Sequence, residues 1–411
     1  MSRPADLAVV GGGIVGLATA YRLLQRHPAL RLVVVEKEPV VAAHQSGHNS
    51  GVLHAGIYYP PRSLKARLCR EGKAALEAFA DAHDIPWEAC GKVVVALDEA
   101  ELPRLDEVYR RALANGVHDV VVIGPERLRE LEPHAAGIRG LHSPGTGIID
   151  FRRVALAYGD EVRARGGEIL LDHEVCGLTR AGDEEVLATA AGDVRARFVI
   201  ACAGLHSDRV AALTGGVDDL HVVPFRGDYY TLRPEARRYC RGLLYPLPDP
   251  TFPFLGVHLT RRIDGEVWAG PNAVLAFRRE GYRLGDLSLR DVAETLAFPG
   301  FRRLARTYLR TGLAEMWRGL SKTAFVRALQ RYVPAVEAAD LVYGPTGVRA
   351  QALRADGSLV DDFVLGGDDR VLHVRNAPSP GATASLAIGR ELAERAEERF
   401  ALGPVATGPH T

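Results

Sequence analysis

The feature that most constrains the fold is a glycine-rich turn between two apolar segments near the start of the sequence. Leu7–Val10 is typical of a parallel strand that is buried on both faces. Gly11, Gly13 and Gly16 follow with the spacing G-x-G-x-x-G, and a helix is expected from Ile14 to Leu24. In that spacing the first glycine permits a tight turn, the second lets the backbone approach a diphosphate, and the third lets the helix pack closely on the strand. The turn therefore predicts a dinucleotide site at the positive end of a helix.

The next strand brings the acidic residue that such a site uses. Leu32–Val35 is a second apolar run, and Glu36 follows it twenty residues beyond Gly16. A carboxylate at this place accepts hydrogen bonds from ribose hydroxyls and repels a 2′-phosphate. The strand before the turn and the helix after it distinguish this motif from an incidental run of glycines. We expect Ile14, Val15, Glu36 and Lys37 to contact the dinucleotide together with the three glycines.

The order of segments favours FAD over NAD. A nicotinamide dehydrogenase usually completes its nucleotide domain in one continuous block. Here an apolar strand at Val371–Val374 and a long helix from about Ala382 to Phe400 come only near residue 400. This discontinuous layout is the one expected of a flavoprotein that carries an inserted substrate domain.

The predicted fold is therefore α/β, with a discontinuous Rossmann-like FAD-binding domain and an α+β substrate domain built on an antiparallel sheet. Short strands alternate with helices expected near Glu99–Asn115 and Leu289–Met316 in the substrate domain. We assign residues 1–86, 146–218 and 345–403 to the FAD-binding domain, 87–145 and 219–344 to the substrate domain, and 404–411 to a flexible tail.

Charge and composition narrow the classes of partner. Lys plus Arg and Asp plus Glu both number 51, so the net charge gives no reason to expect nucleic-acid binding. The five cysteines form no CxxC motif, and no metal is predicted. No apolar run reaches the ~18 residues that a spanning helix requires. We expect a cytoplasmic protein, with peripheral contact at the inner face of the cell membrane left open and no prediction of its oligomeric state.

A family resemblance runs over nearly the whole chain, from Asp6 to about Phe400. The chain resembles the L-2-hydroxyglutarate dehydrogenase/oxidase branch of the D-amino-acid-oxidase-like flavoproteins in the stretches Ser46–Tyr59, Pro224–Tyr230, Tyr245–His258, Gly270–Ala273, Gly347–Gln351 and Arg375–Ser385. The resemblance implies FAD as cofactor and L-2-hydroxyglutarate, a small dicarboxylate 2-hydroxy acid, as substrate. It also implies 2-oxoglutarate as product and a quinone, a dye or oxygen as electron acceptor.

Oxidation of a 2-hydroxy acid requires a base for the hydroxyl proton while a hydride leaves C2 for flavin N5. Histidine suits this role because its pKa lies near the working pH. His54 follows a Gly/Ser loop that should run beside the flavin, and His258 lies in an aromatic, Pro-rich strand. Which of the two is the base stays open, as does a covalent bond from His48 or His54 to the flavin.

The substrate carboxylates require cationic or hydrogen-bonding partners. Arginine grips a carboxylate with two parallel hydrogen bonds, and Arg226 and Arg349 stand out because glycine and apolar residues flank each. Arg349 comes shortly before the strand at Val371–Val374 that returns to the FAD site, so we expect it at the reacting end of the substrate and beside the cofactor. Arg278 is a candidate for the distal carboxylate. Phenolic hydrogen bonds could come from Tyr229, Tyr230 and Tyr245, for which core packing is the alternative.

The remaining cofactor contacts are implied by the resemblance. Small residues at a helix start would allow close approach to the flavin and its ribityl chain. The implied contacts are Ser46, His48, Asn49, Ser50, Gly51, Val52, Leu53, Val175, Ala203, Gly204, Ser379, Pro380, Gly381, Ala382 and Thr383.

Three other functions are compatible with parts of this pattern. An oxidase of the glycine, sarcosine or D-amino-acid type could use the same scaffold, although its cationic substrate would favour a cage of carboxylates or carbonyls over arginines. A flavin-binding module without turnover would not need the His, Arg and Tyr candidates. A nicotinamide dehydrogenase is disfavoured by the discontinuous layout.

Overall fold

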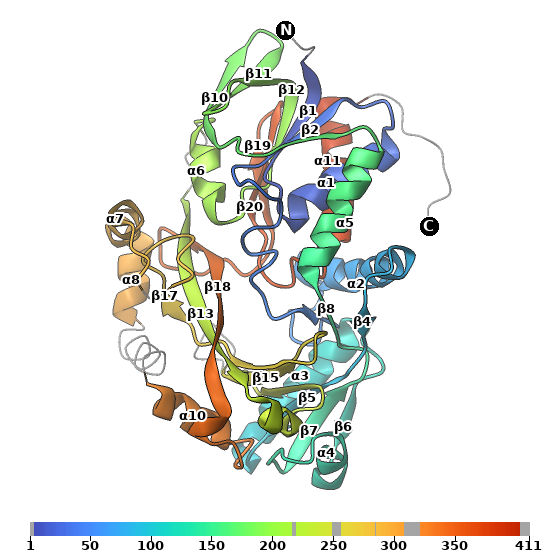
Figure 1. The fold of residues 1–411 in the computed structure, drawn as a ribbon, viewed down its shortest axis with the longest axis vertical. Helices are drawn as coiled ribbons and strands as arrows, with labels where there is room; N and C mark the ends of the chain where they lie inside the picture. Colours follow the sequence, from blue (N-terminus) through green and yellow to red (C-terminus); the bar gives the residue numbers. More distant parts are fainter. Residues whose placement is uncertain (1–3, 216–218, 249–255, 284, 308–320, 403–411) are drawn as a thin grey trace.

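The computed structural model of the chain describes residues 4–215, 219–248, 256–283, 285–307 and 321–402 (Figure 1). Two sheets lie at opposite ends of the long axis, with the sequence passing between them several times. The predicted tail at 404–411 and the last part of the helix expected over Leu289–Met316 lie outside the described residues.

The first sheet contains the predicted dinucleotide-binding unit. Its strands β1 and β2 pair in parallel, and β1 also pairs in parallel with β12. Antiparallel β10 and β11 continue the sheet beyond β12, and β20 joins it by parallel pairing with β12. The strands are β1 (Ala5–Val10), β2 (Leu32–Val35), β9 (Glu168–Leu170), β10 (Val175–Ala181), β11 (Glu184–Thr189), β12 (Val194–Ala201), β19 (Val364–Gly367) and β20 (Val371–Asn376).

Helices from three distant parts of the chain pack together on this sheet: α1 (Ile14–Arg26), α5 (Phe151–Ala164) and α11 (Ser385–Phe400), with α2 (Leu64–Ala82) beside α11. A Cβ on Gly389 of α11 would lie 2.7 Å from the Ala18 carbonyl oxygen of α1, so glycine allows these two helices their close contact. The helix expected from Ala382 begins at Ser385, because residues 380–384 form a tight turn in which the Ala384 N–H bonds to the Pro380 carbonyl.

The second sheet has the strand order β17-β13-β16-β15-β14-β5-β7-β6, with β18 on β13. The predicted antiparallel pairing holds for its strand pairs except β14 and β5, which run parallel. Its strands are β5 (Lys92–Ala96), β6 (Val121–Ile123), β7 (Arg139–Ser143), β13 (Leu220–Leu232), β14 (Leu243–Pro246), β15 (His258–Arg261), β16 (Val267–Gly270), β17 (Val274–Leu275) and β18 (Leu341–Arg354).

One predicted domain boundary falls inside a strand. Strand β18 pairs with β13 from Leu341 to Arg354, so the residues just after 345 extend the second sheet and the chain returns to the first sheet only at β19. The other boundaries remain predictions.

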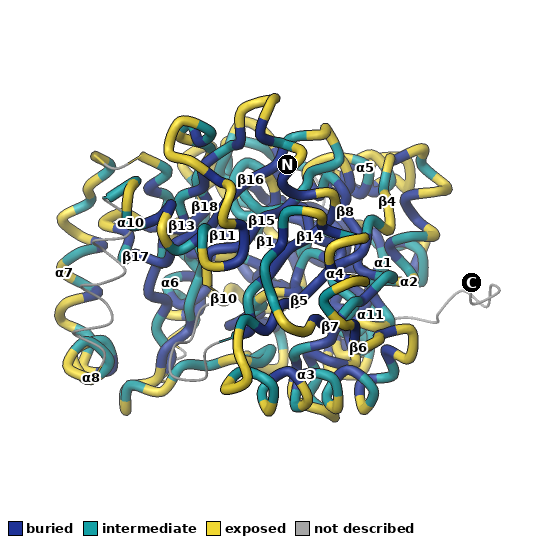
Figure 2. Tube along the Cα trace, turned by 90° about the horizontal axis from the view of Figure 1, so that it is seen from below, coloured by how far each residue is buried: buried dark blue, intermediate teal, exposed yellow. Residues whose placement is uncertain are grey.

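The second sheet is covered by shorter helices, namely α3 (Leu102–Ala114), α4 (Pro125–Leu131) and α10 (Lys322–Gln330), and a small sheet of β3 (Val52–Leu53), β4 (Trp87–Glu88) and β8 (Gly147–Ile149) lies between the two large ones. Figure 2 shows α7 (Leu289–Ala297) and α8 (Pro299–Thr307) at one side with much of their surface exposed. No helix in the described part of the chain is long and apolar enough to cross a membrane.

Candidate active site

A cavity of about 1160 Å³ receives residues from both large sheets. Gly11 and Glu36 line it from the first sheet, and Tyr229, His258 and Arg349 line it from the second. Cavities for single small ligands usually measure roughly 300–1,000 Å³, so this one has room for a dinucleotide and a small substrate together.

The glycine turn has the geometry that a dinucleotide requires. Gly11 has a φ of +110°, and a Cβ there would lie 2.5 Å from the carbonyl oxygen of Cys202. A Cβ on Gly16 would collide with the Gly11 carbonyl oxygen, which explains the third glycine of the motif. Gly13 lines the cavity as the N-cap of α1, whereas Gly16 lies behind the turn and does not line it. The turn therefore fits a diphosphate lying against its backbone.

Glu36 is held by two backbone N–H groups. Its Oε2 accepts a hydrogen bond from Gly12 (2.6 Å), and its Oε1 accepts one from Glu38 (2.9 Å). These donors fix the carboxylate at the cavity wall and leave lone pairs for two ribose hydroxyls. The site thus fits the adenosine half of FAD.

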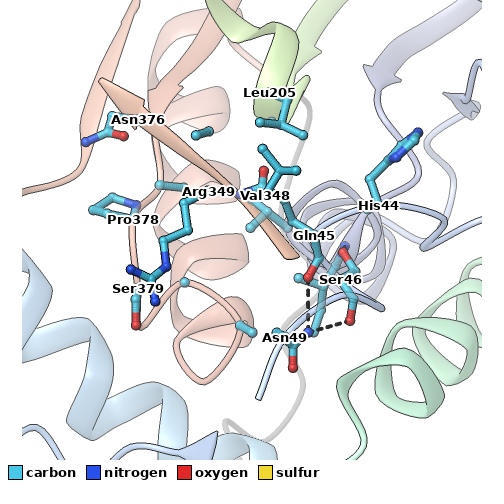
Figure 3. A pocket seen from close by; sticks show the side chains of 18 of the residues that line it. His44, Gln45, Ser46, Asn49, Leu205, Val348, Arg349, Asn376, Pro378 and Ser379 are labelled. Carbon is cyan, nitrogen blue, oxygen red and sulfur yellow. Dashed lines mark hydrogen bonds between the residues drawn. The ribbon is translucent and has the colours of Figure 1, made fainter. Parts of the chain in front are cut away.

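The loop at 46–51 is held by hydrogen bonds between the Asn49 side chain and nearby backbone groups. Asn49 Nδ2 donates to the carbonyls of Gln45 (3.0 Å) and Ser46 (2.8 Å), and its Oδ1 accepts from the Gly51 N–H (2.9 Å) (Figure 3). Ser46 Oγ accepts from the Ile14 N–H at the start of α1 (2.9 Å). The loop is therefore anchored to the helix end that faces the cavity.

The return loop before α11 holds the segment that carries His54. Thr383 Oγ1 accepts a hydrogen bond from the His54 N–H (3.2 Å) and donates to the Val52 carbonyl (3.3 Å). A residue close to the end of the fold thus fixes the backbone of a residue near its start. Figure 3 shows Pro378 and Ser379 of the same loop in the pocket with Arg349.

The two candidate bases are both neutral in this cavity. Burial lowers the pKa of His54 well below its usual value, with further lowering by the charges of Lys92, His258 and Lys65. Burial likewise lowers the pKa of His258 to about 3. The His258 Nδ1 lies 2.8 Å from the Gly256 carbonyl, which selects the tautomer that donates from Nδ1 and keeps a lone pair on Nε2.

Arg349 lies beside Tyr229. Burial raises the pKa of the Tyr229 phenol, opposed by the charges of Arg349 and Arg262 and by hydrogen bonds with Ser50 and Arg349. Tyr245 stacks on the His258 ring with a centroid separation of 3.8 Å. These contacts form a wall of one arginine, one histidine and two tyrosines from four segments of the second sheet.

The structure places most of the other predicted site residues along the same cavity. The residues that line it are Gly11, Gly13, Ile14, Val15, Glu36, Lys37, Ser46, His48, Asn49, Ser50, Gly51, Val52, His54, Val175, Ala203, Gly204, Tyr229, Tyr245, His258, Arg349, Ser379, Pro380, Gly381, Ala382 and Thr383.

Gly16, Leu53 and three predicted substrate residues are absent from this lining among the described residues. Arg226 uses its guanidinium on Asp228 (2.9 Å) and on the Arg283 carbonyl (3.1 Å), so it is engaged within the protein. Tyr230 packs against Phe325 and Tyr343, and Arg278 is exposed. Their geometry therefore does not support the predicted substrate contacts, because strand direction and register decide which arginine faces the cavity.

Sequence reasoning also passed over Lys92 and Tyr58. Lys92 is only 1% exposed, and Tyr58 lines the cavity with a buried hydroxyl. The available signal was a lysine at the start of an otherwise apolar strand, where a charge is unusual.

Glu38, His44 and Glu280 are spaced closely enough to hold a metal ion. The ammonium of Lys37, however, contacts Glu38 and lies 2.9 Å from Glu280. The Lys37 ammonium thus already pairs with both carboxylates, and Lys37, His44 and Glu280 of this cluster line the cavity.

Comparisons with known proteins agree with this geometry. The model of the family described as "FAD dependent oxidoreductase" matches residues 6–395. The chain is 51% identical to an L-2-hydroxyglutarate dehydrogenase, mitochondrial, from Nematostella vectensis, over 97% of this chain and 91% of that protein. It is 44% identical to an L-2-hydroxyglutarate dehydrogenase from Escherichia coli, over 96% of this chain and 94% of that one.

Among solved structures, L-alpha-glycerophosphate oxidase from Mycoplasma pneumoniae with FAD bound has the same fold. The TM-score is 0.78 at 22% sequence identity, covering 100% of this chain and 97% of that one. The family match and the fold confirm the predicted FAD cofactor and α/β flavoprotein architecture. The chain belongs to the FAD dependent oxidoreductase family, together with the L-2-hydroxyglutarate dehydrogenases that it matches at 44–51% identity.

Proposed function

We propose that the protein oxidises L-2-hydroxyglutarate to 2-oxoglutarate with FAD as cofactor. The observation that carries this proposal is the meeting of Arg349, His54 and His258 in the cavity that also contains the dinucleotide turn. These groups supply an anchor for a carboxylate and a base for a hydroxyl proton. The relatives named L-2-hydroxyglutarate dehydrogenase support the choice of substrate.

Arg349 binds the carboxylate next to the reacting carbon. Its planar guanidinium can make two parallel hydrogen bonds to a carboxylate, and Tyr229 beside it limits how the arginine can move. This grip orients C2 and its hydroxyl group relative to the histidines.

A neutral imidazole then accepts the hydroxyl proton. Both His54 and His258 are uncharged over the physiological range because burial lowers the pKa of each. In His258 the Nδ1–H is directed at the Gly256 carbonyl, so Nε2 is the atom that can take the proton. Bound FAD supplies the two-electron acceptor, at N5, for the hydride that leaves C2.

The electrons pass onward to a quinone, a dye or oxygen. Peripheral membrane contact is supported by Leu287, Leu289 and Leu296, which are 60%, 79% and 53% exposed beside the exposed Arg290. Co-sedimentation with anionic phospholipid vesicles tests this contact, and a protein that stays in the supernatant would exclude it.

Anaerobic mixing of the purified yellow protein with L-2-hydroxyglutarate tests the activity. The flavin absorbance band should bleach, and 2-oxoglutarate should appear in a 1:1 ratio to reduced flavin. A band that persists under these conditions rejects the substrate.

An oxidase of amino acids or secondary amines is the second candidate, since the glycine oxidase from Geobacillus kaustophilus shares the fold at 18% identity and a TM-score of 0.70. Arg349 could hold the carboxylate of either substrate class, so the preference for a hydroxy acid rests on the relatives named L-2-hydroxyglutarate dehydrogenase. Bleaching by glycine, sarcosine or a D-amino acid, but not by L-2-hydroxyglutarate, would select this candidate.

A further inference from the structure

A dicarboxylate substrate requires a second anchor, and the arginine predicted for it, Arg278, is exposed away from the cavity lining. A second cation, Lys92, lies against two aromatic rings of the cavity wall without lining the cavity itself. Lys92 is 1% exposed, and no salt bridge to a carboxylate is found for it among the described residues. Buried charges are normally paired, because isolation from water is costly. A buried lysine without a protein counter-ion next to a ligand cavity points to an anionic ligand.

Lys92 lies against two aromatic rings of that wall. Its Nζ is 4.1 Å from the ring centroid of Tyr245 and 5.3 Å from that of Tyr58. These contacts provide some cation–π stabilisation but cannot replace a full negative charge. Both tyrosines line the cavity, and the buried Lys92, which does not line it, contacts their rings.

Tyr58 is the second, independent observation. Its hydroxyl oxygen is buried and has no hydrogen-bond partner among the described residues. A buried phenol without a partner costs free energy unless a ligand satisfies it. A carboxylate oxygen is the acceptor that would satisfy both this hydroxyl and the ammonium behind it.

The spacing along the wall suits a substrate with two carboxylates. Tyr245, His258, Gly270 and Tyr229 follow one another on four neighbouring strands, with Arg349 beside Tyr229. Neighbouring strands lie about 4.8 Å apart, so the backbones of Tyr245 and Tyr229, three strands apart, are separated by roughly 14 Å. Their long side chains shorten the distance that a ligand has to span. His258 lies between the two cationic ends.

We propose that the Tyr58 hydroxyl and the Lys92 ammonium form the subsite for the second carboxylate of the substrate. Tyr58 donates a hydrogen bond to this carboxylate, and Lys92 supplies the compensating charge from behind the aromatic wall. The subsite thereby selects dicarboxylic over monocarboxylic acids. This inference rests on the proposed function, whose substrate carries the second carboxylate.

The test is a titration of the holoenzyme with glutarate and with butyrate, followed by the perturbation of the flavin spectrum. The wild type should bind glutarate at least ~10-fold more tightly than butyrate. Tyr58→Phe and Lys92→Met should each weaken glutarate binding roughly 10- to 100-fold, the usual effect of losing a hydrogen bond to a charged group, and leave butyrate within about twofold. In turnover, the same variants should raise KM for L-2-hydroxyglutarate more than they lower kcat.

Tyr230→Phe is the matched control, because that tyrosine also has a buried hydroxyl but packs against Phe325 and Tyr343 and does not line the cavity. It should leave both ligands unaffected. Equal binding of glutarate and butyrate to the wild type, or an equal loss for both ligands in Tyr58→Phe, would overturn the proposal. If L-2-hydroxyglutarate fails to bleach the wild-type flavin while glutarate still binds with the predicted pattern, the proposed activity is wrong and the subsite stands.

Discussion

The burial of Lys92 without a counter-ion makes a prediction about stability. Burial lowers the pKa of its ammonium from 10.5 to about 7. Because the pKa of Lys92 is lower in the folded state than in the unfolded state, protonation of this amine favours the unfolded state. As far as Lys92 is concerned, the free energy of unfolding is highest above pH 10.5 and falls as the pH decreases toward 7. At about 1.4 kcal/mol per pKa unit, the penalty amounts to about 4 kcal/mol at pH 7 and about 1 kcal/mol at pH 10.

Methionine has a similar length and no charge, so Lys92→Met should remove this penalty. We expect the variant, saturated with FAD and free of substrate, to exceed the wild type in free energy of unfolding by about 2–4 kcal/mol at pH 7. The difference should shrink to about 1 kcal/mol at pH 10. Denaturant unfolding at both pH values, followed by circular dichroism, measures it.

Lys65→Met is the matched control, because Lys65 is also buried but pairs with Asp361 at 2.6 Å. Its replacement breaks this ion pair and removes no unpaired buried charge, so it should not stabilise the protein. A Lys92→Met variant that is less stable than the wild type at pH 7, or a difference that does not change with pH, would show that Lys92 has a stabilising partner and refute the reasoning.

Three further predictions concern the cofactor and the base. Replacing the imidazole that accepts the proton with asparagine should slow turnover at least ~100-fold. Stopped-flow flavin reduction in His54→Asn and His258→Asn therefore identifies this histidine. Near-normal rates in both variants would exclude histidine as the base. Gly16→Ala should yield a protein with little flavin absorbance, because the new methyl group collides with the Gly11 carbonyl oxygen, and full FAD content would contradict this. Because the pKa of both histidines is lowered and the neutral form is the active one, kcat/KM should remain high below pH 6.5, and a half-maximal point at pH 6.5 would contradict the burial of the base.

The nucleotide-binding unit could be predicted from sequence because its signals are local. The apolar runs at Leu7–Val10 and Leu32–Val35, the glycine spacing and the position of Glu36 each follow from interactions within one βαβ unit. The late return of the chain to the first sheet could also be predicted, because β20 is a short apolar strand that pairs with β12.

The substrate side could be predicted only in part, because it depends on strand register. Arg226 and Arg349 have similar neighbours in sequence, yet one pairs with Asp228 and the other lines the cavity. The role proposed for Lys92 depends on the absence of a carboxylate near its ammonium among the described residues. No local sequence pattern reveals that absence. The boundary predicted at 345 lies within β18, whose pairing with β13 is a long-range contact that no local pattern reveals.

The hydrogen bonds of Thr383 have a consequence for how the protein is made. The segment that carries His54 leaves the ribosome more than 300 residues before the threonine that fixes its backbone. Until β20 and α11 have emerged and docked, the first sheet lacks a strand, α1 lacks its neighbour, and the cofactor cradle is open on one side. Folding that depends on such distant contacts is slow. A chain that stalls before residue 371 should therefore accumulate as a colourless, protease-sensitive intermediate, and FAD should bind only after β20 and α11 have been synthesised.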